Sequence, residues 1–457
     1  MPITDLKKLI DEEYEAENYD LARTLIRKTP DDLKIDIAFH VESSLRDERY
    51  DSLDRGKIFS TLLPVWRSEK IRISEAKPVK RETLADALGT NENVTFFQHS
   101  PSNPPSALLN FSQEHSQLSS GILYHDYRSY RSHLNGDGVR DKNTNDVFVI
   151  KNCIFPSCFW YPSRPNAIPF TEDGTYIERL LTGQKNPHLL NFDYAHRAEI
   201  KSEIDCVFVM PGAYGNGFWH FIQNSLPTLS LYKKLELDCP IIIPNVNFSR
   251  FPALMDALDM VMDFLRISKS RIISPQDYVH VKSNVAIAPS ISHPSTSTVQ
   301  FWNDVFDFHK EINTYPEFIY LSRSAKGRRC ILNEKEVESV FKEYGFSVYD
   351  FNEMSFMEQA SVFRSAKIIA SPHGAGLVHL NFCTEKPTVL EFITKPWNQS
   401  FSNGTALVGG TYVPFISDLS KPMRLDDPDA SFYIDIKKLA NVVETLMIDF
   451  EKGHNNE

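Results

Sequence analysis

The sequence has no apolar run that approaches the ~20 residues of a membrane-spanning helix. Its first residues, MPITDLKKLIDEEYEAENYD, are polar and acidic, unlike a secretion signal. Basic charge is also in deficit, because 49 Lys and Arg face 60 Asp and Glu and the net charge is −11. A phosphate backbone is bound by a basic surface, so the net charge argues against nucleic acid as the main partner, although local basic sites are still possible. We expect a cytoplasmic chain with no membrane span.

Cysteine is scarce and scattered. The six cysteines show no metal-type pairing, so the sequence predicts reduced, buried thiols, which favours a cytosolic setting. The acidic run at 426–429 lies in a polar turn, and we predict no metal site there. A truncated lumenal enzyme stays an alternative, because the chain carries five glycosylation sequons. They begin at Asn93, Asn110, Asn247, Asn398 and Asn403.

Residues 1–80 are predicted to form an α-helical extension. Apolar residues recur there at helical spacing in two stripes, which are Leu6, Leu9, Ile10 and Tyr14, then Tyr19, Ala22, Leu25 and Ile26. No repeat of fixed period follows, so an accessory helical cap fits better than a repeat array. Such helices leave room for a protein partner.

Residues 82–201 carry fewer signals. Short apolar runs predict strands at 94–97, 121–124, 147–150 and 158–161, and a Gly-, Asp- and Asn-rich segment predicts a loop at 135–145. We expect a meander of β-strands laid against the first large domain.

The most informative stretch runs from 354 to 393. Ser355 and Glu358 form a capping-box pattern that opens a helix, and the apolar run 368–370 predicts a strand. The segment SPHGAG follows as a glycine loop, and a helix is predicted from Leu377, before another strand at 388–393. A helix start offers unpaired N–H donors, so this arrangement suits a phosphate or diphosphate, although a structural turn is the alternative.

The segment just upstream repeats the alternation of strand and helix. A strand at 318–322 ends at Arg323, a helix opens at Asn333 with Glu336 as its capping partner, and Gly345 ends that helix before a strand at 346–349. Alternating strands and helices predict a parallel sheet, in which ligands bind beyond the carboxyl ends of the strands. Arg323, the glycine loop and Glu391 all fall at that edge.

A similar unit lies earlier in the chain. A buried strand at 206–210 leads through a glycine-rich turn into a helix that starts near Phe218. Its apolar face comprises Phe218, Phe221, Ile222, Ser225, Leu229 and Tyr232. The opposite, polar face carries His220, Gln223 and Asn224 and is predicted to point into a cleft. Further strands at 241–243 and 271–273 and helices at 253–265 and 302–310 complete this half.

These segments resemble glycosyltransferase family 61. The stretches YLSRSAKGRRCILNEKEVESVF, SPHGAGLVHLNF and PTVLEF resemble its C-terminal signature. The stretch GNGFWHFIQNSLPTLSLYKKL resembles its upstream motif, in which a histidine is followed four positions on by a carboxylate, and which closes with Leu-Pro. The resemblance spans about 205–394, with a fainter echo back to about 146. The family includes bacterial capsule-type enzymes and eukaryotic N-acetylglucosaminyl- and xylosyltransferases.

The resemblance implies an α/β fold of GT-B type, in which two Rossmann-like domains face each other across a cleft. We expect the helical extension at 1–80, an acceptor-side domain at 81–314 and a donor domain at 315–430. A C-terminal helix within 431–457 is expected to cross back to the first domain. The family also implies a nucleoside-diphosphate sugar as donor, inversion at the anomeric carbon and no obligatory metal cofactor.

His220 is the predicted catalytic base, because imidazole titrates near neutral pH and its helix face looks out of the core. A histidine that only hydrogen-bonds the loop or the acceptor is the alternative. Asn216, Gln223 and Asn224 are the expected acceptor-side residues. Asn224 departs from the family motif, which has a carboxylate at that position. Either His220 or another acidic residue is then the base, or the chain binds without transfer.

The donor diphosphate is expected to contact the second half. Arg323 and the pair Arg328 and Arg329 would supply guanidinium groups, with solvated loop arginines as the alternative. His373, Gly374, Ala375 and Gly376 would supply backbone donors. Glu391 would accept hydrogen bonds from ribose hydroxyls, or would instead cap the glycine loop.

The sequence therefore predicts an inverting hexosyl-, N-acetylhexosaminyl- or pentosyltransferase. The expected donor is a UDP-sugar, the expected acceptor is a glycan or glycoconjugate, and polysaccharide biosynthesis is the expected setting. The alternative is a non-catalytic carbohydrate- or nucleotide-binding protein of the same fold that acts with a partner.

Overall fold

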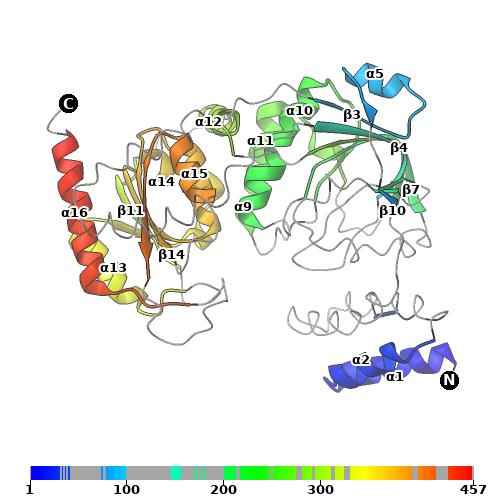
Figure 1. Ribbon diagram of the computed structural model, residues 1–457, viewed down its shortest axis with the longest axis horizontal. Coiled ribbons are helices and arrows are strands. Elements are labelled where there is room, and N and C mark those ends of the chain that lie inside the picture. The colour runs from blue at the N-terminus through cyan, green and yellow to red at the C-terminus, as the bar shows by residue number, and fades with distance from the viewer. Residues whose placement is uncertain are drawn as a thin grey trace.

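The computed structural model describes the parts of the chain that carry the two sheets and the helices around them (Figure 1). The described residues are 2–30, 33, 37, 40–41, 74–75, 79–98, 146–155, 170–171, 175–176, 180, 200–212, 217–244, 246, 248, 251–273, 280–290, 294–309, 314–323, 330–393, 400–417 and 431–454. Several predicted features lie outside these residues: the strand at 121–124, the loop at 135–145, the strand at 158–161, the acidic run at 426–429, Asn216, Arg328 and Arg329.

The first half is built on a ten-stranded mixed sheet. Its strand order is β1-β6-β5-β4-β10-β7-β8-β9, with β3 pairing β4 and β2 pairing β3. The strands are β1 Ser74–Glu75, β2 Val79–Lys80, β3 Val94–Gln98, β4 Asp146–Phe155, β5 Phe170–Thr171, β6 Thr175–Tyr176, β7 Ile200–Val209, β8 Ile241–Ile242, β9 Ile272–Ile273 and β10 His280–Pro289. The strands β10, β7, β8 and β9 run parallel, and the predicted strands at 206–210, 241–243 and 271–273 are confirmed.

The expected meander laid against the first domain is wrong in one respect. Strand β4 pairs antiparallel with β10, so β3 and β4 extend the same sheet instead of packing on it. The pattern of burial gives the reason. Val147 and Val149 of β4 join one apolar cluster and Phe148 and Ile150 join another, so both faces of the strand are covered.

Helices of the first half pack on the face that carries Phe208 and Ile241. They are α5 Leu84–Gly89, the continuous run α9 Phe218–His220, η5 Phe221–Ser225, η6 Leu226–Thr228 and α10 Leu229–Lys234, then α11 Pro252–Leu265 and α12 Thr296–His309. The 3-10 turn η7 Lys269–Arg271 leads into β9. The predicted N-terminal helices are present as α1 Ile3–Glu15 and α2 Tyr19–Arg27, and their apolar stripes share a cluster with Ile37 and Val41.

The second half is a five-stranded sheet in which every neighbouring pair is parallel, as the alternation of strands and helices predicts. Its order is β12 Ser347–Tyr349, β11 Phe318–Leu321, β13 Ile368–Pro372, β14 Thr388–Ile393 and β15 Thr411–Ile416. On one face lie α13 Glu334–Glu343 and α16 Ile436–His454. On the other lie α14 Phe356–Ser365, η10 Ala375–Phe382 and α15 Ser400–Leu407. The turn η9 Phe351–Glu353 precedes α14. The two sheets and their helices establish a mixed α/β fold.

Local helix signals in this half are largely confirmed. Ser355 and Glu358 form the complete capping box at the start of α14. Gly345 follows α13 at φ +77°, a left-handed conformation that favours glycine. Asn333 does precede α13, but its amide does not cap that helix. It instead exchanges two hydrogen bonds with the backbone of Ile434, of 2.9 and 3.0 Å, and so ties α13 to the segment before α16.

The expected crossing of the C-terminal helix to the first half is wrong. Helix α16 packs on α13 and on the second sheet, at the end of this half that lies away from the first sheet (Figure 1). Leu439, Val442, Val443 and Leu446 form its buried stripe, and the ring of Phe450 meets that of Phe318 at 5.0 Å. The reason is that α13 and this side of the sheet expose apolar side chains, and α16 buries them.

A different set of elements joins the two halves. Phe356 of α14 and Phe382 of η10 belong to the same apolar cluster as Trp302 of α12. The ring centroid of Trp302 lies 5.5 Å from that of Phe356 and 5.7 Å from that of Phe382. Trp302 is fully buried. The interface is therefore a continuous core.

The lengths of the helices and the state of the cysteines bear on two further expectations from the sequence. In the described ranges, every helix is too short or too polar to span a bilayer. The five cysteines in the described part of the chain form no disulfide, and four of them are buried.

The position of α16 can be tested by truncating its buried stripe. Leu439→Ala removes a fully buried side chain from the second core and should lower the free energy of unfolding by about 2–5 kcal/mol. The matched control is Glu444→Ala on the exposed face of the same helix, which should change it by less than about 0.5 kcal/mol. Urea unfolding measures both. Equal effects of the two substitutions would contradict the packing described.

Candidate functional site

The glycine loop follows β13, as the sequence predicts, and leads into a 3-10 helix that starts at Ala375, two residues before the expected position. Gly374 has φ −174°, which is ordinary extended backbone. A Cβ at 374 would lie 3.3 Å from Nη1 of Arg323, so a larger residue would require the guanidinium to move by a few tenths of an ångström. Ala375 and Gly376 open η10, and the first amides of a helix have no acceptor within it. The loop therefore brings backbone donors and a guanidinium together.

Arg323 stands at the carboxyl end of β11 and contacts this loop directly. Its Nη1 donates to the carbonyl oxygen of His373 at 3.1 Å, and its backbone N–H donates to Oε1 of Glu334 at 3.2 Å. The hydroxyl of Tyr320 donates to the same carboxyl oxygen at 2.6 Å. Burial raises the pKa of Glu334. These contacts fix the strand end, and they confirm that Arg323 and the glycine loop lie side by side.

Glu391 is buried, with 2% of its surface exposed. One carboxyl oxygen accepts a hydrogen bond from Nδ1 of His373, and the other accepts one from the hydroxyl of Tyr412. The ring of Phe401 packs against His373 at 4.9 Å. In this arrangement Glu391 holds the side chain of the first loop residue, which agrees with the alternative of a structural role at the loop. Contact of Glu391 with ribose stays a prediction.

His220 lies on the helix that follows β7, beside the ring of Trp219. Its Nδ1 is 2.8 Å from Oδ1 of Asn224. An amide oxygen only accepts, so this contact places the proton on Nδ1 and the basic lone pair on Nε2. Burial lowers the pKa of His220, and the hydrogen bond that His220 donates to Asn224 opposes that change only in part. Asn224 thus sets the tautomer in which Nε2 is the basic nitrogen.

The predicted polar face of this helix needs correction. Residues Phe221–Ser225 form a π-helical turn, which shifts the side chains that follow away from regular α-helical positions. Gln223 and Asn224 are only 3% and 2% exposed, so they lie inside the protein and do not face an open cleft. The sequence held one signal for this, because Pro227 has no N–H to donate to the carbonyl of Gln223.

Gln223 links this helix to the second half of the chain. Its Oε1 accepts a hydrogen bond of 2.9 Å from Nδ2 of Asn381 in η10, 158 residues further on. Asn381 Nδ2 also donates to the carbonyl of Val378 at 3.0 Å. The carbonyl of Asn381 accepts from Nδ2 of Asn303 at 3.1 Å. Asn381 is therefore held by its own helix through its side-chain amide and by α12 through its backbone carbonyl.

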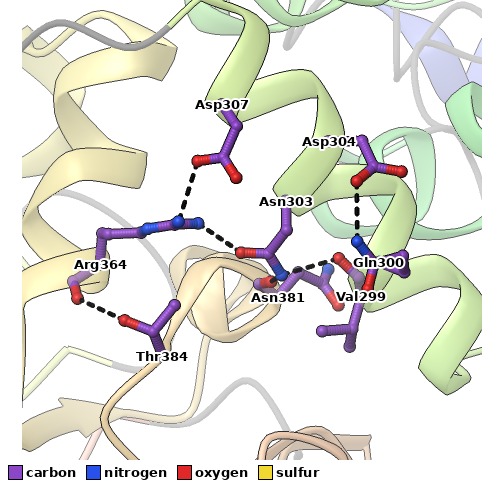
Figure 2. A network of polar contacts seen from close by, with 8 residues as sticks. All are labelled: Val299, Gln300, Asn303, Asp304, Asp307, Arg364, Asn381 and Thr384. Carbon is purple, nitrogen blue, oxygen red and sulfur yellow. Dashed lines mark hydrogen bonds and ion pairs between the residues drawn. The ribbon is translucent and has the colours of Figure 1, made fainter.

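The polar contacts continue along the interface between α12 and α14 (Figure 2). Nη1 of Arg364 donates to Oδ1 of Asn303, and Nη2 forms an ion pair of 2.9 Å with Asp307. The sequence analysis singled out none of Asn303, Asp307, Arg364 or Asn381. No local pattern marks them, since their partners lie far away in the sequence.

His379 of η10 was also missed. It is fully buried among the rings of Phe218, Phe351, Phe356 and Phe363. Its Nε2 is 2.8 Å from Oε1 of Gln359, whose Nε2 is committed to the carbonyls of Phe351 and Met354. His379 therefore donates from Nε2 and is neutral. Burial lowers its pKa to about 3.

Residues 218–390 match the family model described as Glycosyltransferase 61. This segment of the chain is therefore similar to glycosyltransferase family 61. The family supports a transferase activity, and no curated protein matches the chain.

The glycosyltransferase 61 segment begins at the first residue of α9 and ends inside β14, one residue before Glu391. It therefore contains His220, Arg323, the glycine loop and both partners of the Gln223–Asn381 hydrogen bond. Each of these lies in a segment that follows the carboxyl end of β7, β11 or β13.

His379 makes the family segment sensitive to acid. Its pKa is about 6.5 when unfolded and about 3 when folded, so its contribution to stability is complete above pH 6.5 and is lost as the pH falls toward 3. Between pH 7 and pH 5 this group should cost about 2 kcal/mol. His379→Gln retains an N–H donor for Gln359 and removes the titration. In urea unfolding, the wild type should lose about 2 kcal/mol more than this variant over that range. Equal losses would contradict the assignment.

Proposed function

We propose that this chain is an inverting glycosyltransferase of GT-B type that moves a sugar from a nucleoside-diphosphate sugar, expected to be a UDP-sugar, to a hydroxyl of a glycan or glycoconjugate. The observation that carries the proposal is the contact between two helices that each follow the carboxyl end of a parallel strand. The helix with His220 follows the carboxyl end of β7, η10 follows that of β13, and the two are joined by the hydrogen bond between Gln223 and Asn381. Ligands of parallel sheets bind at such strand ends.

In the proposed division, residues 81–314 hold the acceptor and residues 315–430 hold the donor. Nε2 of His220 takes the proton of the acceptor hydroxyl. The hydroxyl oxygen attacks the anomeric carbon from the side opposite the diphosphate, the bond from that carbon to the diphosphate oxygen breaks, and the nucleoside diphosphate leaves. The sugar is transferred with inversion, and Asn216 is proposed to lie on the acceptor side.

The leaving diphosphate gains negative charge, and the donor half offers groups that match it. The guanidinium of Arg323 lies on the glycine loop, and the first amides of η10 follow at Ala375 and Gly376. His373 is fixed by Glu391, which keeps the loop in one conformation. Arg328 and Arg329 are proposed to add positive charge. No obligatory metal is part of this proposal, so addition of a chelator should leave the rate unchanged.

The second candidate is a carbohydrate- or nucleotide-binding protein without transferase activity, because Asn224 stands where the family motif has a carboxylate. The hydrogen bond from His220 to Asn224 favours the enzyme, since an amide oxygen can orient the imidazole and leave its Nε2 basic. A cytoplasmic location and a role in polysaccharide biosynthesis are proposals that rest on the sequence.

Donor binding can be tested by thermal shift with UDP-, GDP-, CMP- and dTDP-linked sugars, since a ligand of the folded state raises the melting temperature. We expect one class of nucleotide sugar to stabilise the wild type. Arg323→Ala should remove most of that shift by removing the charge on the glycine loop. Arg266→Ala, at the end of α11, is the control and should bind like the wild type. No shift with any nucleotide sugar at millimolar concentration would contradict the donor site.

The assignment of the base can be tested with two substitutions. His220→Ala should lower kcat by about 100-fold to 10,000-fold while the donor-induced thermal shift remains. Asn224→Asp places a carboxylate beside Nδ1 and stabilises the imidazolium, so it should raise the pKa of His220.

The wild type has a lowered His220 pKa, so its rate should stay high below pH 6.5 before it falls in acid. In Asn224→Asp the acidic limb of the kcat/KM profile should move to higher pH. An unchanged limb would argue against His220 as the base. A wild type that binds donor but neither transfers nor hydrolyses it would favour the binding protein.

A further inference from the structure

We infer that Gln223 and Asn381 are positioning residues, whose hydrogen bond sets the distance between the base and the donor loop. The inference rests on the proposed function and adds to it a pair that links the two substrate sites. The bond of 2.9 Å is buried, with Gln223 3% and Asn381 6% exposed. It joins the helical run that carries His220 to η10, the helix that begins at the glycine loop.

The position of Gln223 in the π-helical turn lets it influence the orientation of His220, the proposed base. It directly precedes Asn224, whose Oδ1 orients His220. A π-helical turn interrupts the regular helix, and such turns are frequent at functional sites. Both Gln223 and Asn224 are enclosed by protein, so a movement of Gln223 is transmitted to Asn224 and from there to the imidazole.

The position of Asn381 gives it a fixed relation to the donor loop. It lies in η10, the 3-10 helix that continues directly from Gly374. Its side chain also donates to Val378 within that helix, and its carbonyl accepts from Asn303 of α12. Asn381 is therefore anchored at two points besides Gln223, so it serves as the reference against which Gln223 is placed.

Stability alone does not explain a glutamine at 223. In the described structure, Nε2 of Gln223 is a buried donor with no hydrogen-bond partner, which generally costs about 1–3 kcal/mol. A methionine of similar length would fill the same space without a buried polar group. Residues that are locally unfavourable are expected at functional sites, where a different requirement decides their identity. The requirement here is the acceptor that Oε1 presents to Asn381.

The test compares kcat, donor KM and melting temperature of Gln223→Met with those of the wild type. We expect kcat to fall about 10-fold to 100-fold, because the base is displaced from the reacting hydroxyl. The donor KM should stay within about twofold, since Arg323 and the loop are untouched. The melting temperature should stay within about 2 °C of the wild type or rise, because a buried unpaired donor is removed. A purely structural role would instead lower the melting temperature and leave kcat unchanged.

Two further variants complete the experiment. The exchange Gln223→Asn with Asn381→Gln keeps the summed length of the pair and should recover part of the lost kcat. Asp307→Asn breaks the ion pair with Arg364 at the same interface and leaves the hydrogen bond between Gln223 and Asn381 in place, so it should keep the wild-type kcat. A wild type that transfers no sugar overturns both the proposed function and this inference. A wild type that transfers, with Gln223→Met at full kcat, overturns the positioning role alone.

Discussion

The whole arrangement depends on the placement of η10 against the helices of the first half. One face of this short helix packs in the core of the second sheet through Leu377 and Leu380, whereas Val378 and Phe382 belong to the apolar cluster around Trp302. The helix thus contributes to both cores at once. Because packed cores resist continuous deformation, the halves are held in one defined arrangement at this point. The loop that precedes η10 takes its position from the same contact.

Apolar packing holds the interface together, and the polar contacts determine the relative orientation of the helices that form it. The ion pair of Arg364 with Asp307 is partly exposed and contributes little by itself. The bonds of Asn381 and Gln223 are buried, so a mismatch there would leave polar groups unpaired and would be costly. The buried hydrogen bond between Gln223 and Asn381 therefore specifies how the helix of His220 packs against η10. The partly exposed ion pair between Arg364 and Asp307 contributes less to this orientation.

Local signals in the sequence predicted much of the fold. The strands β11, β13 and β14, the capping box at Ser355 and the end of α13 at Gly345 follow from short-range patterns, and all are present. The contact of Arg323 with the glycine loop also followed, because parallel strands bring their carboxyl ends together.

Long-range contacts could not be read in the same way. Helix α16 has an apolar stripe that would fit either half, and only the uncovered face beside α13 decides between them. Gln223 and Asn381 are 158 residues apart, and neither residue type marks a pairing. The π-helical turn depends on the environment of Gln223 and Asn224, which a regular helical pattern does not reveal. The sequence therefore predicted which loops lie together at the candidate site. It did not predict the burial of Gln223 and Asn224 or their side-chain contacts.

Hydrogen exchange measured by mass spectrometry, with and without a stabilising nucleotide sugar, tests the central claim most directly. The claim is that the donor loop and the helix of His220 form one site at the interface of the two halves. The account predicts slower exchange of backbone amides in 372–382 on donor binding, together with slower exchange in 218–228. Exchange in α1 and α16 should not change. Protection confined to one of the two segments, or located elsewhere in the chain, would contradict a shared site.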